Sequence, residues 1–273
     1  MGERMNPIDE VVKTFLKTAK PIHTEKWQGV DIKDRPEAEM KEQLFVKFEM
    51  PIPDNIEELK NLCQPNLPWA DNHFEQERVS GEPINPGKTW EYWPWASSAN
   101  KFRNKNEQFN HSYAERYWPK LANQTPEGKL KTLKMGWVYE NLRTINGIRE
   151  PYGDLNDLIS LLKREPNTRQ AYLPVFFPED TGAVHGGRIP CSLGYHFIQR
   201  NDLLHVSYYL RSCDIYRHMR DDIYLTCRLL FWILDKIKEE HPNIKPGCLD
   251  MHITSLHCFI SDYELIKKKM KII

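Results

Sequence analysis

The chain has 273 residues, of which 40% are hydrophobic and 11% aromatic, so it can bury a sizeable core in one large domain or two small ones. Its 38 lysines and arginines balance 38 acidic residues, which argues against a protein dedicated to coating nucleic acid. The sequence shows no signal-peptide-like stretch and no apolar run of about 18 residues that could span a bilayer. We therefore expect a cytoplasmic protein that requires neither a membrane nor a nucleic acid.

The six cysteines contain no CxxC pair and no cysteine–histidine cluster with zinc-site spacing. We expect free thiols and no metal site, and for most of these positions a small buried apolar side chain is the ordinary role. The cysteines are Cys63, Cys191, Cys213, Cys227, Cys248 and Cys258.

The N-terminal half begins with an expected amphipathic helix over residues 7–19, where apolar residues recur at helical spacing. Residues 63–120 are instead rich in proline, asparagine and tryptophan. Five of the eight tryptophans lie between positions 69 and 118. A structureless loop of this length is unusual in a compact domain. We predict irregular segments around short helices, an insertion-like region folded against the main body.

The C-terminal half alternates between helix and strand patterns. Asp154 can cap a helix that runs to about residue 164, and residues 170–177 have strand character. Residues 189–199 and 203–211 predict a strand pair joined by a polar turn at 200–202, followed by the most apolar helix (222–238) and a last strand (248–259) before a charged tail. We expect a single α+β domain over 1–273, with a large mixed or antiparallel sheet and one central buried helix.

Three segments of this half carry residues suited to a nucleotide. Arg169, Arg211 and Ser212 can form charge-assisted hydrogen bonds to a phosphate. Guanidinium groups near Cys191 would favour its thiolate, the nucleophilic form of cysteine. The set indicates a nucleoside-monophosphate site beside a reactive thiol.

In this order the segments resemble the thymidylate synthase superfamily. The arginine-rich DPxSRR segment of the family corresponds to REPNTRQ (164–170), its Pro-Cys nucleophile to Pro190-Cys191, and its QRSxD strand end to LRSCD (210–214). Its GDxHxYSNH segment corresponds to CLDMHITSLH (248–257), its VYGxxWR turn to residues 138–143, and its IWDEWA segment to YWPKLA (117–122). The resemblance covers about residues 115–258, and PC…RSxD is its most specific part.

The resemblance implies a folate-dependent C5 transferase. The Cys191 thiolate would add to C6 of a pyrimidine and make C5 nucleophilic, and 5,10-methylenetetrahydrofolate would supply one carbon. It also implies a homodimer in which Arg169 reaches the phosphate in the other subunit's site. Trp118 and Tyr139 would contact the folate.

The resemblance further assigns Asp214 to catalysis and His252 to the sugar. The family's catalytic glutamate lies before a Gly-x-x-Asn element, and Glu77 is our candidate, with Glu75 and Glu82 as rivals. Because the family tyrosine of the sugar site is Thr254 here, ribose and deoxyribose both stay open.

Asp222 stands where the family has the asparagine that reads the base. Cytosine offers an amino donor at N4, which suits an acidic acceptor, whereas O4 of uracil would be repelled by a carboxylate. The hydroxymethylases of the superfamily carry aspartate here, and the tail after His252 is short for the closing segment that serves hydride transfer in the synthases. An alternative is that Asp221 and Asp222 only cap the following helix.

We therefore predict a transferase that converts dCMP or CMP to the 5-hydroxymethyl nucleotide. One alternative is a thymidylate-synthase-type or uridylate C5 transferase acting on dUMP. The other is a non-catalytic nucleotide- or RNA-binding relative. The basic stretch Arg217, His218 and Arg220 has no assigned role, although it replaces a family segment next to the site.

Overall fold

The computed structural model describes residues 6–27, 30–99, 103–120, 144–145, 148–149, 153–183 and 188–270. Its main element is a six-stranded sheet with the strand order β1-β4-β10-β9-β8-β7. β9 and β10 pair in parallel and the other neighbours pair antiparallel, so the sheet is mixed. The strands are β1 (Lys20–Ile22), β4 (Met40–Pro51), β7 (Tyr172–Pro174), β8 (Ser192–Arg200), β9 (Leu203–Asp214) and β10 (Lys245–Phe259).

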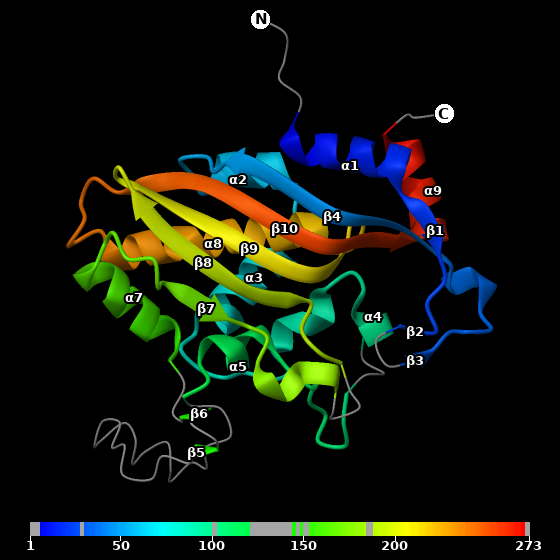
Figure 1. Ribbon diagram of the computed structural model, residues 1–273, viewed down its shortest axis with the longest axis horizontal. Coiled ribbons are helices and arrows are strands. Elements are labelled where there is room, and N and C mark those ends of the chain that lie inside the picture. Colours follow the sequence, from blue (N-terminus) through cyan, green and yellow to red (C-terminus); the bar gives the residue numbers. More distant parts are fainter. Residues whose placement is uncertain are drawn as a thin grey trace, which may run out of the picture.

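One long helix, α8 (Met219–Ile237), packs against this sheet. It crosses behind β8, β9 and β10 in Figure 1. Most of its residues are buried, including every residue from Ile223 to Leu230, because it presents apolar side chains on almost every side. The predicted α+β fold with a large mixed sheet and a central buried helix is confirmed.

Further helices cover the same core. α1 (Pro7–Thr18) begins at Asn6, whose side chain accepts a hydrogen bond from Ile8 N, and its apolar stripe is buried as predicted. α7 (Leu155–Arg164) begins with a capping box formed by Asp154 and Asp157. The expected charged tail contains a helix, α9 (Ile260–Lys269).

Residues 63–120 form short helices, as predicted. They are α3 (Trp69–His73), the π-helix η2 (Phe74–Arg78), the 3-10 helix η3 (Lys88–Tyr92), α4 (Ala96–Ala99) and α5 (Tyr113–Tyr117). The remaining short elements are α2 (Ile56–Cys63), the 3-10 helices η1 (Pro36–Ala38) and η6 (Pro178–Ala183), and the two-stranded pairs β2 (Lys26–Trp27) with β3 (Val30–Asp31) and β5 (Thr144–Ile145) with β6 (Ile148–Arg149). Asn66 connects the region of residues 63–120 to α8, because its backbone N–H and its side-chain amide both donate to Asp221.

The predicted strand pair is the hairpin β8–β9. Its turn residues Asn201 and Asp202 have φ angles of 49° and 60°. Two successive left-handed residues match the twist of the flanking strands in a two-residue hairpin turn, and asparagine and aspartate tolerate that conformation better than most residues.

The sheet is interrupted at one level across neighbouring strands. Phe45 in β4 has a φ of 57°, Thr254 in β10 has no paired residue on either side, and Leu193 is an extra residue between paired Ser192 and Gly194. On β10, positions 249, 251 and 253 are buried before this level and 256 and 258 after it. The set of β10 side chains that face the core therefore changes at this level, while the register of β10 with β4 and β9 is the same on both sides of it.

Among the described residues, no helix has the length and apolar character needed to cross a membrane.

Candidate functional site

A cavity of about 680 Å³ opens where the strand ends meet the first turn of α8 and residues 63–120. Its size is typical of small-molecule sites. The predicted site residues that line it are Glu77, Cys191, Arg211, Ser212, Asp214 and Asp222.

The thiol of Cys191 is held at the start of β8 by the neighbouring strand. Its backbone carbonyl accepts from Arg211 N at 2.9 Å. Its Sγ lies 3.5 Å from Ser212 Oγ and 3.8 Å from Arg211 Nη2. Arg211 also donates to the carbonyls of Pro190 at 2.8 Å and Ile189 at 3.1 Å. One guanidinium thus fixes the approach to the nucleophile and places positive charge beside it.

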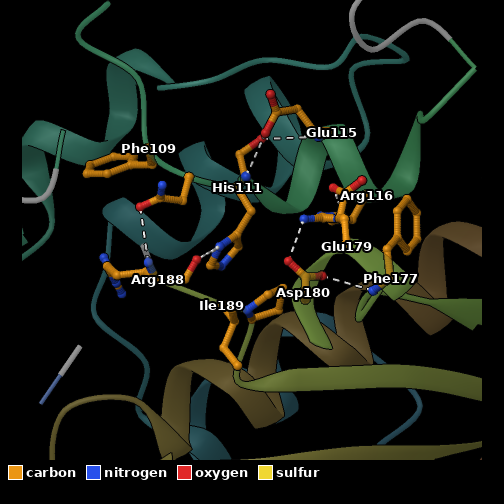
Figure 2. Close-up of polar contacts among 12 residues, drawn as sticks. Phe109, His111, Glu115, Arg116, Phe177, Glu179, Asp180, Arg188 and Ile189 are labelled. Carbon is orange, nitrogen blue, oxygen red and sulfur yellow. Dashed lines mark hydrogen bonds and ion pairs between the residues drawn. The ribbon is translucent and has the colours of Figure 1, made fainter. Parts of the chain in front are cut away.

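Arg188 adds a second cationic side chain to the cavity lining. Figure 2 shows how its backbone is fixed: Arg188 N donates to Asn110 Oδ1 at 3.1 Å, and His111 Nδ1 donates to the Arg188 carbonyl at 3.3 Å. Burial, with the charge of Arg188 adding to it, lowers the pKa of His111 to about 3, so this ring is neutral. No motif in the sequence marks Arg188, although it stands only three residues before Cys191.

Asp222 lines the cavity from the first turn of α8, and its Oδ2 lies 3.7 Å from Cys213 Sγ. Burial raises the pKa of Asp222 to about 7, and the charge of Arg78 opposes this shift. The capping alternative is wrong, because the N-cap of α8 is His218 without a side-chain cap bond. Asp221 instead accepts from Asn66 N at 2.8 Å and Asn66 Nδ2 at 2.7 Å.

Glu77 is only 5% exposed and lines the cavity from the π-helix η2. Its carboxylate accepts from His73 Nδ1, Thr89 N and Thr89 Oγ1, each at 2.7 Å. Burial by itself would raise the pKa of Glu77, but these hydrogen bonds outweigh it and hold the pKa below its ordinary value. The rival Glu75 pairs with Arg228 at 2.8 Å, and neither Glu75 nor Glu82 lines the cavity.

Asp214 shapes the turn that leads into α8. Its Oδ1 accepts from Tyr216 N and Arg217 N, both at 2.9 Å, and burial raises its pKa. Arg217 lines the cavity and binds Asp262 at 2.7 Å, whereas Arg220 turns away and binds Asp9 at 2.6 Å. The unassigned basic stretch is therefore divided between the cavity wall and a contact with α1.

Three predicted residues lie away from this cavity. His252 stacks on Tyr209 at a ring distance of 4.9 Å and bonds Asp250 at 2.7 Å, while Arg169 is exposed on the surface. Trp118 is buried, and its Nε1 donates to the Arg78 carbonyl at 3.0 Å. Tyr139 lies outside the described residues.

Aromatic side chains that were not selected from the sequence form another wall of the cavity. Trp69, Trp90 and Trp93 lie with ring centres 4.9–6.5 Å apart, and His218 stacks on Trp93 at 4.9 Å. The indole nitrogens of Trp69 and Trp90 are buried without a hydrogen-bond partner, while a hydrogen bond from Trp93 to Asp221 opposes the rise in the pKa of that aspartate. A flat aromatic ligand could stack on the ring faces of this wall. Within the described residues, no group of three His, Cys, Asp or Glu side chains could hold a metal ion.

Comparison with known proteins supports the fold rather than a closer relationship. No family model matches the sequence, and no curated protein is similar to it in sequence. The structure is similar to that of thermostable thymidylate synthase A from Bacillus subtilis, with a TM-score of 0.64 over 97% of this chain and 83% of that one, at 12% sequence identity. The chain has a thymidylate synthase-like fold.

Proposed function

We propose that the protein is a pyrimidine-nucleotide C5 one-carbon transferase, and more narrowly a hydroxymethyltransferase acting on dCMP or CMP with 5,10-methylenetetrahydrofolate. One observation carries the proposal. The thiol of Cys191, with Arg211 and Ser212 against it, faces the same cavity as two carboxyl groups of different proton affinity, Glu77 and Asp222. Paired acids with separated pKa values are typical of sites that move protons.

The phosphate of the nucleotide would bind at the cationic end of the cavity. Arg188 and Arg211 line it beside Cys191, and Ser212 adds a hydroxyl group. Charge-assisted hydrogen bonds of this kind hold phosphate groups strongly. This position would place the pyrimidine next to Cys191.

Asp222 is suited to cytosine because its pKa is near neutrality. A protonated carboxyl group can accept from the N4 amino group and donate its own proton to N3. When Asp222 is ionised, the amino group of cytosine is still a donor to it, whereas O4 of uracil is repelled. In the ionised form each base keeps one donor for the carboxylate, the N4 amino group of cytosine or N3–H of uracil, so the preference for cytosine depends on which of these donors lies against Asp222.

In the reaction, the Cys191 thiolate would add to C6 and convert C5 into an enamine-like carbon nucleophile. Glu77 lies in the cavity as a buried carboxylate held by three donors, so it can orient a water molecule or accept a proton near C4 and C5. After C5 has gained its carbon and lost its proton, the thiolate leaves C6.

Methylenetetrahydrofolate would supply the carbon at the formaldehyde oxidation level. After C5 attacks this carbon, its bond to the folate nitrogen would break and release tetrahydrofolate, and water would add to the carbon to give a hydroxymethyl group without oxidation of the folate. The aromatic wall fits such a cosubstrate, because Trp69, Trp90 and Trp93 line the cavity with flat aromatic rings. These residues would hold the pterin and benzoyl rings in place of Trp118, which is buried outside the cavity.

The test is to incubate the protein with dCMP, CMP or dUMP labelled with tritium at C5, with and without methylenetetrahydrofolate, and to measure tritium release and product mass. A product heavier than dCMP or CMP by one hydroxymethylene unit supports the proposal. A methylated product from dUMP would identify a thymidylate-type transferase. Absence of C5 exchange with all three nucleotides would indicate a binding protein that kept the fold.

A further inference from the structure

The carboxylate of Glu77 is connected to a buried arginine through one histidine ring. His73 Nδ1 lies 2.7 Å from Glu77 Oε2, and Arg78 Nε donates to His73 Nε2 at 3.0 Å. All three residues are buried, with exposures of 9% for His73, 5% for Glu77 and 4% for Arg78. The three residues lie at the junction of α3 and the π-helix η2, so one local segment builds the whole arrangement.

The chemistry of arginine fixes the proton on His73. A guanidinium group stays protonated in proteins and has no acceptor, so His73 Nε2 must be the bare nitrogen that accepts from Arg78 Nε. The ring proton then lies on Nδ1 and is donated to Glu77. If His73 carried a proton on both ring nitrogens, its Nε2–H and Arg78 Nε–H would point at each other as two donors. Both side chains would also be positively charged. Burial lowers the pKa of His73 and the charge of Arg78 lowers it further, which agrees with a neutral ring.

We propose that Arg78 and His73 are positioning residues for Glu77: Arg78 selects the Nδ1–H tautomer of His73, and His73 then holds Glu77 as an oriented carboxylate in the cavity. If His73 took the other tautomer, its Nδ1 lone pair would face the carboxylate, and Glu77 would have to rotate or bind a proton. The inference deepens the proposed function, on which it rests for the role of Glu77 in catalysis.

The surroundings keep this arrangement in place. Trp69 stacks on His73 with a ring distance of 5.0 Å and an interplanar angle of 9°, and Trp118 Nε1 donates to the Arg78 carbonyl at 3.0 Å. The Arg78 guanidinium lies 4.0 Å from the centre of the Tyr113 ring. A buried cation and a buried carboxylate are thus both partnered, which is the condition under which charges are tolerated inside a protein.

Other titratable groups also face Arg78, and they must be considered in any pH measurement. They are Tyr113 and Tyr117 from α5, Tyr195 from β8, Tyr208 from β9, and Asp221 and Asp222 from α8. Burial holds the pKa values of the four tyrosines above their ordinary value, so these groups stay neutral through the pH range of an enzyme assay. Burial raises the pKa of both aspartates, that of Asp222 to about 7, so Asp222 titrates within the assay range and its variant belongs in the experiment.

The direct test is ¹⁵N NMR of the full chain with labelled histidine, in which His73→Asn identifies the His73 signals. We expect a protonated Nδ1 and an unprotonated Nε2 whose shifts stay constant from pH 6 to 9. A proton on Nε2, or a cationic ring near pH 7, would overturn the proposal. This result does not depend on catalysis, so it is separate from the test of the proposed function.

The functional test compares Arg78→Lys, Arg78→Gln and Arg78→Met in the C5 tritium-release assay over a range of pH. In Arg78→Met we expect kcat at pH 7 to fall by about tenfold or more and the acidic limb of the profile to move up by about one pH unit. Arg78→Lys retains a charged donor, so its kcat and the position of its acidic limb should lie between those of Arg78→Met and wild type. Because Asp222 also titrates in this range, the shift must persist when Asp222→Asn is the background.

Arg220→Met is the matched control, since it removes a partly buried arginine that pairs with Asp9 outside the cavity. It should leave the pH profile unchanged. If Arg78→Met folds and shows the wild-type profile, the positioning role is refuted. If Arg78→Met does not fold, Arg78→Gln and the wild-type tautomer decide the question. If the wild-type protein releases no tritium, the proposed function fails, while the NMR result still decides the tautomer.

Discussion

Gly87 leaves the space that the Glu77 carboxyl group occupies. A Cβ atom added at Gly87 would stand 1.7 Å from Glu77 Cδ and about as close to both carboxylate oxygens. The backbone of Gly87 is extended, with φ −80° and ψ 157°, so any residue could adopt its conformation. Glycine is required at this position because of the neighbouring side chain.

Gly87→Ala should therefore displace Glu77 and break its hydrogen bonds to His73 and Thr89. We expect kcat for C5 tritium release to fall by about 10²-fold or more, while dissociation constants for nucleotides change only a few-fold. Gly153→Ala is the control, because its new Cβ would meet the Asp157 carboxylate only at an ordinary 3.7 Å. Wild-type kcat in Gly87→Ala would remove Glu77 from the catalytic scheme.

Cys191→Ala should abolish C5 exchange and leave nucleotide binding in place. The thiol is needed for the addition to C6, whereas the cavity arginines contribute to affinity. Cys248→Ala is the control, since Cys248 is a free cysteine that does not line the cavity. The measurements are tritium release and isothermal titration with dCMP. Turnover by Cys191→Ala close to wild type would exclude covalent catalysis at this residue.

Asp222→Asn should change the preferred base. The amide offers a donor to O4 and an acceptor for N3–H of uracil, and it no longer matches cytosine as well. A mismatched buried polar group typically costs about 1–3 kcal/mol, or roughly 5- to 150-fold. We expect lower kcat/KM for dCMP and CMP, a gain for dUMP, and losses for all three in Asp222→Ala. An unchanged preference in Asp222→Asn would show that Asp222 does not read the base.

The same substitution should raise stability in a pH-dependent way. The pKa of Asp222 is about 7 in the folded chain and near 3.8 by its ordinary value. Between pH 4 and 7 the Asp222 carboxyl group is protonated in the folded state and ionised in the unfolded state. The free energy of unfolding therefore falls as pH rises from about 4 to 7. Each pKa unit is worth about 1.4 kcal/mol, which limits the gain in Asp222→Asn to about 4 kcal/mol.

The check is urea denaturation of both proteins at several pH values. The difference in the free energy of unfolding between Asp222→Asn and wild type should be absent near pH 4, grow towards pH 7 and stay constant above pH 7. Asp235→Asn is the control on the same helix, because Asp235 is exposed and paired with Lys238. A constant difference over the whole range would show that Asp222 does not titrate as described.

Arg169 is exposed in the single chain and lies outside the cavity, so a role in phosphate binding requires a second subunit. We predict a homodimer in which mixed subunits carrying Arg169→Ala and Cys191→Ala regain part of the activity that each variant lacks alone. Sedimentation and an assay of the mixed sample measure this. Replacing Arg164, an exposed arginine on α7, with alanine is the control. An active monomer would exclude the trans role of Arg169.

Periodicity in the sequence predicted the elements with a strong local signal. The apolar stripe of α1, the capping residue Asp154 of α7 and the hairpin at Asn201 and Asp202 all appear in the structure as expected. Strand β4 was not predicted, although residues 46–50 alternate between apolar and charged side chains as in a half-buried strand. The strand exists because β1 and β10 pair with it on both sides.

For the site, short motifs selected Cys191, Arg211 and Ser212, which are near one another in sequence or on paired strands. They did not select Arg78, His73 or Arg188, since nothing in a single sequence marks a buried cation until the fold closes around it. The tryptophan wall was visible as a composition change but not as a site, because core packing and ligand stacking use the same residues.

The interruption of the sheet at Thr254 determines which face of the sheet each later side chain of β10 lies on. Because side chains alternate with a period of two, one unpaired residue amounts to a half-period shift, and it brings Ser255 and His257 into the cavity lining while Leu256 and Cys258 stay buried. Shortening β10 by one residue here would exchange these two sets. The composition of the cavity wall therefore depends on the length of this strand as well as on its sequence.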